Sequence, residues 1–123
     1  MAGQRVLVVE DNEKNMKLFR DVLQATGFTV LEAATGEDAL ELAREHHPAL
    51  VLMDVQLPGI DGAETLARLR DDERTATIPV LALTAQAMRG DRERFLESGF
   101  DGYLAKPVDI RELVAAVREA VQA

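Results

Sequence analysis

The stretch that decides the fold is Ala49-Leu50-Val51-Leu52-Met53-Asp54, in which five apolar residues are followed by a carboxylate. A continuous apolar run of this length, without polar alternation, is typical of a strand covered on both faces, as in a parallel sheet. Similar short runs occupy residues 6–9, 80–83 and 103–105. Residues 29–34 are less uniform because Glu32 interrupts them, and we expect them to form an edge strand.

Five longer stretches have apolar residues at helical spacing. The clearest is the last, which starts at Ile110 and has Asp109 before it as a candidate N-cap. The predicted helices cover residues 13–26, 36–46, 62–72, 88–98 and 110–121. Regular alternation of strands and helices predicts an α/β fold, a doubly wound five-stranded parallel sheet with five helices. We expect strand order 2-1-3-4-5, as in flavodoxin-like folds, and one domain over residues 1–123.

The composition excludes several classes of function. The 123 residues include 22 acidic and 14 basic side chains, a formal net charge of −8, so direct binding to nucleic acid or an anionic membrane is not expected. The chain has no cysteine, which excludes disulfides, thiolate zinc sites and cysteine nucleophiles. No apolar run approaches the roughly 20 residues of a membrane span, and the first residues do not form a signal peptide. We expect a cytoplasmic protein.

Polar side chains stand where four of the predicted strands end. They are Glu10 and Asp11 after the first strand, Asp54 at the third, Thr84 at the fourth and Lys106 at the fifth. In a doubly wound sheet of this order, ligands bind beyond the carboxyl ends of the first and third strands. We therefore expect three carboxylates, a hydroxyl and an ammonium group to meet in one shallow pocket.

This set of groups favours phosphoryl transfer with a metal ion. Three carboxylates at close range repel one another, so a proton or a cation must neutralise part of their charge. Oxygen ligands of this kind favour Mg²⁺, with Mn²⁺ as the alternative. Asp54 is the candidate nucleophile because a carboxylate can form an acyl phosphate. Lys106 and the metal would neutralise the phosphoryl charge, while Thr84 would donate a hydrogen bond to a phosphoryl oxygen.

Taken together, these motifs resemble those of CheY-like receiver domains, the response-regulator part of two-component systems. The matching segments are Val8-Val9-Glu10-Asp11-Asn12, Leu52-Met53-Asp54-Val55-Gln56-Leu57-Pro58-Gly59-Ile60-Asp61-Gly62, Leu83-Thr84-Ala85 and Tyr103-Leu104-Ala105-Lys106-Pro107. Within the family, residues 10–16 and 84–91 are similar to DivK-type single-domain response regulators and to receivers attached to hybrid kinases.

The resemblance implies a role for each site residue. Asp54 would be the phosphoacceptor, and the metal would be held by Glu10, Asp11, Asp54 and the backbone carbonyl of Gln56. The residues implied in phosphate binding and switching are Thr84, Ala85, Tyr103 and Lys106. The peptide bond before Pro107 is expected to be cis.

The family also implies the partners. A sensor histidine kinase or a histidine phosphotransfer protein would supply the phosphoryl group from a phosphohistidine. Phosphorylation would change the face formed by residues 88–98, 103–105 and the last helix, which would then bind a downstream protein target. Such a protein is not an enzyme in the usual sense, since it catalyses only its own phosphotransfer and dephosphorylation.

Three residues beside the acidic pair are candidates for docking a kinase helix bundle. They are Asn12, Asn15 and Met16. The apolar residues of the first helix spread over an arc of about 160°, wider than one core-facing stripe needs. Met16 lies at the end of that arc nearest the acidic pocket, so we expect it to form part of the docking surface.

Two alternatives remain open within this fold. The chain resembles a receiver domain of a hybrid histidine kinase almost equally well, although Met1 and the lack of residues after the fifth helix favour a standalone protein without an output domain. A pseudo-receiver, which binds a partner without phosphorylation, is the other alternative. A nucleotide-binding module is not expected, because no glycine-rich phosphate loop follows the first strand.

Overall fold

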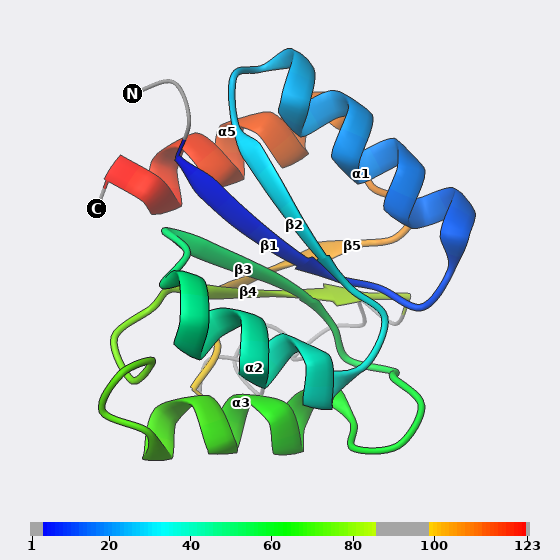
Figure 1. Cartoon of the computed structure of the whole chain (residues 1–123). Helices are drawn as coiled ribbons and strands as arrows, with labels where there is room; N and C mark the ends of the chain where they lie inside the picture. Colours follow the sequence, from blue (N-terminus) through cyan, green and yellow to red (C-terminus); the bar gives the residue numbers. More distant parts are fainter. Residues whose placement is uncertain (1–3, 86–98, 123) are drawn as a thin grey trace.

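The computed structural model describes residues 4–85 and 99–122 and contains a five-stranded parallel sheet (Figure 1). The strands are β1 (Arg5–Val9), β2 (Thr29–Ala33), β3 (Leu50–Asp54), β4 (Val80–Thr84) and β5 (Gly102–Ala105). Their order is β2-β1-β3-β4-β5, and every neighbouring pair is parallel. The predicted strand order and the edge position of β2 are confirmed.

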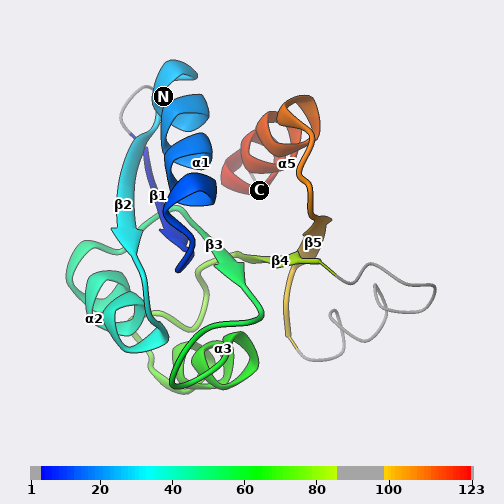
Figure 2. The ribbon, with the colours of Figure 1, turned by 90° about the vertical axis from the view of Figure 1, so that its right-hand side faces the viewer.

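Helices cover both faces of this sheet. Within the described residues they are α1 (Glu13–Ala25), α2 (Gly36–His46), α3 (Gly62–Asp71) and α5 (Ile110–Gln122). Helices α1 and α5 lie on one face, and α2 and α3 lie on the other (Figures 1 and 2). The remaining predicted helix, residues 88–98, falls outside the described residues. None of the described helices combines the length and the apolar character needed to cross a membrane.

The core consists of two apolar clusters, one on each face of the sheet. Leu7 and Val9 of β1 belong to the cluster under α2 and α3, whereas Val6 and Val8 belong to the cluster under α1 and α5. Strands β3 and β4 are buried along their whole length. Neighbouring residues of one strand therefore face different helical layers, which is why these strands are continuously apolar in sequence.

The helices begin at the edge of the sheet where the strands end. Helices α1, α2 and α3 have Asn12, Thr35 and Asp61 as N-caps. The Asn12 side chain accepts hydrogen bonds from two backbone N–H groups of the first turn, and the other two side chains accept one each. Asp109 Oδ1 does the same for α5, which confirms the predicted cap. Satisfying the first N–H groups of each helix fixes the loops that carry the polar side chains at this edge.

Gly62, the first residue of α3, brings the helix against the end of β3. Its N–H donates to the carbonyl oxygen of Val55 at 3.1 Å. A Cβ atom at Gly62 would lie 2.7 Å from the carbonyl oxygen of Asp54 and 2.7 Å from the Cα atom of Val55. Because both of these atoms belong to the backbone, they have little freedom to move away. The lack of a side chain at residue 62 therefore sets the position of the Asp54 backbone.

We predict that Gly62→Ala lowers the free energy of unfolding by about 2 kcal/mol, because the added methyl group overlaps backbone atoms. Urea unfolding followed by circular dichroism measures this loss. The control is Ala63→Gly at the exposed next position of α3, where the loss of helix propensity costs at most about 1 kcal/mol. If Gly62→Ala costs no more than this control, the close packing of α3 on β3 is contradicted.

Candidate functional site

The sheet fixes the backbone from which the polar side chains extend. The N–H of Glu10, one residue beyond β1, donates to the carbonyl oxygen of Ala33 at 2.9 Å. The N–H of Lys106, one residue beyond β5, donates to the carbonyl oxygen of Thr84 at 2.7 Å. Both residues thus continue the hydrogen-bonding pattern of the sheet, and the strand order places them on either side of β3.

An ion cluster joins the ends of β1, β3 and β5. The ammonium nitrogen of Lys106 lies 2.7 Å from Asp54 Oδ2, 3.0 Å from Glu10 Oε2 and 3.3 Å from Glu10 Oε1. Glu10 and Asp54 are only 2% and 6% exposed. Two further donors complete the cluster, since the backbone N–H of Gln56 donates to Asp54 Oδ1 at 2.9 Å and Asn15 Nδ2 donates to Glu10 Oε1 at 3.0 Å. Donors from three separate segments of the chain thus hold the two carboxylates in place.

The cluster shifts the pKa of two of its members. Burial raises the pKa of the Glu10 carboxyl above its ordinary value, and the hydrogen bonds from Asn15 and Lys106 oppose this shift only in part. Burial by itself would lower the pKa of the Lys106 ammonium group, but its hydrogen bonds to Asp54 and Glu10 outweigh burial and raise it. Lys106 is therefore fully charged at neutral pH, whereas the charge on Glu10 is costly.

Three carboxylates converge beside this ion cluster. Glu10, Asp11 and Asp54 each offer one oxygen atom, and these three atoms lie within 4.8 Å of one another. Oxygens bound directly to one Mg²⁺ at about 2.1 Å lie at most about 4.2 Å apart, and Mg²⁺ usually keeps several waters. The donor set therefore fits a Mg²⁺ ion, with room left for the waters that it usually keeps. The same group of oxygen donors also suits Mn²⁺.

The carboxylates open into a pocket of about 840 Å³ at the end of the sheet. Predicted site residues that line this pocket are Glu10, Asp11, Asn12, Asn15, Asp54, Gln56, Ala85 and Lys106. The loop between β3 and α3 also lines this pocket, through Val55, Leu57, Pro58 and Asp61. The structure thus brings most of the predicted residues into one site.

Two predicted switch residues lie in the sheet itself. Thr84 is buried at the end of β4, opposite Ala105 of β5. Tyr103 is half-buried on β5 and packs against the apolar cluster under α2 and α3. The peptide bond between Lys106 and Pro107 is cis. The roles of Thr84 and Tyr103 in switching, and of the Gln56 carbonyl as a metal ligand, stay predictions.

The structure corrects one part of the predicted docking surface on α1, the exposure of Met16. Met16 is only 8% exposed and packs in the cluster under α1 and α5, so it belongs to the core. The exposed apolar side chain of this helix is Leu18, at 41%. Asn12 is exposed and serves as the N-cap of α1, and the docking roles of Asn12 and Asn15 stay predictions.

The contact between Asn15 and Glu10 does not follow from the sequence pattern. Asn15 is the third residue of α1, and helical side chains point back toward the N-terminus of their helix. Because α1 follows directly after the end of β1, that direction leads from Asn15 toward Glu10. The one feature of the sequence that could have predicted this contact is the position of Asn15 in the first turn of the helix.

Comparison with known proteins places the chain in a family. Residues 6–118 match the response regulator receiver domain family. The polar-differentiation response regulator DivK of Brucella ovis is 48% identical over 113 residues, which are 92% of each chain. This protein therefore belongs to the response regulator receiver domain family of two-component signalling.

Solved structures agree with this assignment. The receiver domain of sensor histidine kinase PA1611 from Pseudomonas aeruginosa superposes with a TM-score of 0.91 at 36% identity, covering 99% of this chain and 100% of that one. That structure has a magnesium ion coordinated in its active-site cleft. The chemotaxis response regulator CheY4 of Vibrio cholerae gives a TM-score of 0.89 at 25% identity, covering 97% of this chain and 99% of that one.

We predict that Glu10→Gln changes how stability depends on pH in EDTA. The raised pKa means that the folded protein holds the Glu10 proton more tightly than the unfolded chain does, so stability falls as pH rises above the ordinary value of 4.5. The variant lacks this fall and is more stable than the parent protein at neutral pH, with a smaller difference in acid. Urea unfolding between about pH 4 and about pH 8 measures the difference in free energy of unfolding between the variant and the parent protein.

The control for net charge is Glu13→Gln, which removes an exposed carboxylate from the same end of the molecule. Parallel curves for the parent protein and Glu10→Gln across this pH range would show that burial of Glu10 has no effect on its proton affinity.

Proposed function

We propose that this chain is a cytoplasmic, DivK-type response regulator that accepts a phosphoryl group from a histidine kinase on Asp54. The observation that carries this proposal is the position of Asp54. Its carboxylate lies 2.7 Å from the Lys106 ammonium nitrogen and beside the carboxylates of Glu10 and Asp11, in an open pocket at the carboxyl ends of β1 and β3. The 48% identity to DivK over 92% of both chains supports this type over a hybrid-kinase receiver.

The transfer step needs little rearrangement of the acceptor. A carboxylate oxygen of Asp54 attacks the phosphorus of the donor phosphohistidine, an O–P bond forms, the P–N bond breaks, and the imidazole leaves. Backbone N–H donation by Gln56 and the ammonium group of Lys106 hold the carboxylate in a fixed orientation. In-line attack on phosphorus depends mainly on such positioning and on neutralisation of charge.

Glu10, Asp11 and Asp54 would hold the metal ion, with the Gln56 carbonyl as the further ligand that the family resemblance implies. When bound, Mg²⁺ supplies positive charge to the oxygens of the phosphoryl group. Lys106 neutralises charge from the β5 side, and the Thr84 hydroxyl donates to a phosphoryl oxygen. These groups belong to four different strand ends, so they reach the phosphoryl group from different directions.

The output of this reaction is a change of a protein-binding face. Phosphorylation replaces the single charge of the Asp54 carboxylate by a phosphoryl group that carries close to two negative charges and three acceptor oxygens at the end of β3. Movement of Thr84 toward the phosphoryl group lets Tyr103 turn inward, which alters the face of β5 and α5, together with residues 88–98, which lie outside the described residues. The partners are a sensor histidine kinase or a histidine phosphotransfer protein, and a downstream protein target. The only reactions that the protein catalyses are its own phosphotransfer and dephosphorylation.

We predict that the protein gains one phosphoryl group when incubated with phosphoramidate or acetyl phosphate and Mg²⁺. Intact-protein mass spectrometry measures the gain. Asp54→Asn and an EDTA sample of the parent protein should show none, since the first lacks the nucleophile and the second lacks the metal ion. A folded parent protein that gains no mass under any condition would instead be a pseudo-receiver that binds its partner constitutively.

We predict that Lys106→Met slows phosphoryl uptake at saturating Mg²⁺ by about 100-fold, the usual cost of removing one donor to a developing anion. Methionine is unbranched and keeps most of the length of the side chain, but it has no charge. The rate is followed by mass spectrometry with phosphoramidate. Lys17→Met removes an exposed lysine of α1 and should retain the parent rate. Equal rates for Lys106→Met and the parent protein would remove Lys106 from the reaction.

A further inference from the structure

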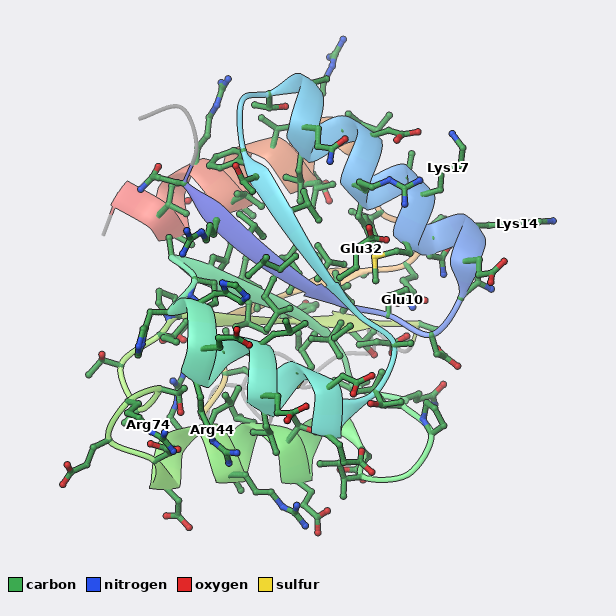
Figure 3. The ribbon with its side chains drawn as sticks, in the orientation of Figure 1. Glu10, Lys14, Lys17, Glu32, Arg44 and Arg74 are labelled. Carbon is green, nitrogen blue, oxygen red and sulfur yellow. The ribbon has the colours of Figure 1, made fainter. Side chains whose placement is uncertain are left out.

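The first turn of α1 is tied to the acidic site by the side chain of Asn15. Asn12 Oδ1 accepts hydrogen bonds from the N–H groups of Lys14 at 3.0 Å and of Asn15 at 3.1 Å, which fixes the backbone of this turn. From that backbone, Asn15 Nδ2 reaches Glu10 Oε1 at 3.0 Å. Figure 3 shows Glu10 beside the start of α1, while the neighbouring Lys14 side chain points away from the molecule.

Glu10 needs such a contact because its side chain has one more rotatable bond than an aspartate. Lys106 approaches the Glu10 carboxylate from β5 and also binds Asp54. Without a second donor, the Glu10 side chain would be attracted toward β5 alone. Asn15 binds the same carboxylate from a different element, α1. At Oε1 the bond from Asn15 is the shorter of the two, 3.0 Å against 3.3 Å from Lys106.

We propose that Asn15 is a positioning residue that holds the Glu10 carboxylate in the orientation needed to bind a divalent cation together with Asp11 and Asp54. This inference rests on the proposed function. Asn15 contacts Glu10 through its Nδ2–H group, and an N–H donor is not a ligand for a cation. Groups that orient metal ligands in this way commonly change metal affinity by tenfold or more when they are removed.

A merely structural role for Asn15 makes a different prediction. Asn15 is half-buried in the first turn of a helix, and its backbone N–H is bound by Asn12 whatever its side chain is. If the side chain served only the stability of α1, its loss would lower stability and leave the Mg²⁺ affinity unchanged. If the Asn15 side chain acts through Glu10, its loss changes the Mg²⁺ affinity. That change should then occur with glutamate at residue 10 and be lost with the shorter aspartate.

The test is a double-mutant cycle read by NMR titration with MgCl₂. The proteins are the parent, Asn15→Ala, Glu10→Asp and the double variant. Asn15→Ala should raise the Kd for Mg²⁺ about tenfold. Aspartate is shorter by one methylene group and withdraws from Asn15, so in the Glu10→Asp background the same change should alter the Kd by less than about twofold. The spectra in EDTA report whether each variant is folded.

A second readout separates positioning from a direct role in transfer. The rate of phosphoryl uptake from phosphoramidate is measured as a function of MgCl₂ concentration. Asn15→Ala should raise the half-saturating Mg²⁺ concentration about tenfold and keep the maximal rate within about twofold of the parent rate. Gln24→Ala, which removes an exposed amide at the far end of α1, is the matched control and should change neither quantity.

The outcomes separate this inference from the proposed function. An unchanged Kd for Asn15→Ala, or an equal loss of affinity in the parent and the Glu10→Asp backgrounds, overturns the positioning role and leaves the phosphoacceptor role of Asp54 intact. A parent protein that binds no Mg²⁺ and gains no phosphoryl group overturns the proposed function itself. A tenfold loss that disappears in the Glu10→Asp background establishes that Asn15 acts through Glu10.

Discussion

The contact of one ammonium group with two buried carboxylates is the constraint on which the site depends. Lys106 bridges Glu10 and Asp54, which are 96 and 52 residues away in sequence. Two carboxylates with 2% and 6% exposure are not stable side by side without a cation between them. The lysine can reach both only because β1, β3, β4 and β5 end at the same edge of one parallel sheet. The strand order is therefore a requirement of the electrostatics as well as a result of the packing.

The rest of the fold keeps this edge rigid. The two apolar clusters pack against the central strands from both faces of the sheet. The backbone at Asp54 is therefore restrained against movement toward either face. Gly62 brings α3 against the end of β3 without a side chain between them. N-caps fix the loops in which the polar residues lie. Such rigidity suits an acceptor whose reaction depends on orientation, because no reorganisation is needed when the charge develops.

The sequence predicted the sheet and the polar residues at its edge, because both follow from strong local signals. Continuous apolar runs mark strands covered on both faces, and a single strand order then brings Glu10, Asp54 and Lys106 together. The rotation of α1 about its axis was harder to predict. The apolar arc of α1 spans about 160°, which is wider than the face that a helix buries, so residues at one end of the arc must stay exposed. The sequence does not show which end that is. Packing of α1 against the sheet and α5 buries Met16 and exposes Leu18, and no periodicity within α1 carries that information.

The same rotation explains why the site contains a contact that sequence patterns did not assign to it. With Met16 turned into the core, the side chain of the preceding residue Asn15 contacts Glu10. The acidic cluster then has an amide donor from α1 and an ammonium donor from β5. One ammonium group among three carboxylates leaves a formal charge of −2, which matches a divalent cation. A phosphoryl group on Asp54 would carry close to two negative charges in place of the single charge of the carboxylate, so it would add about one further negative charge. Lys106 would then serve the phosphoryl oxygens as well as Glu10, and Asn15 would be the donor that stays with Glu10 throughout.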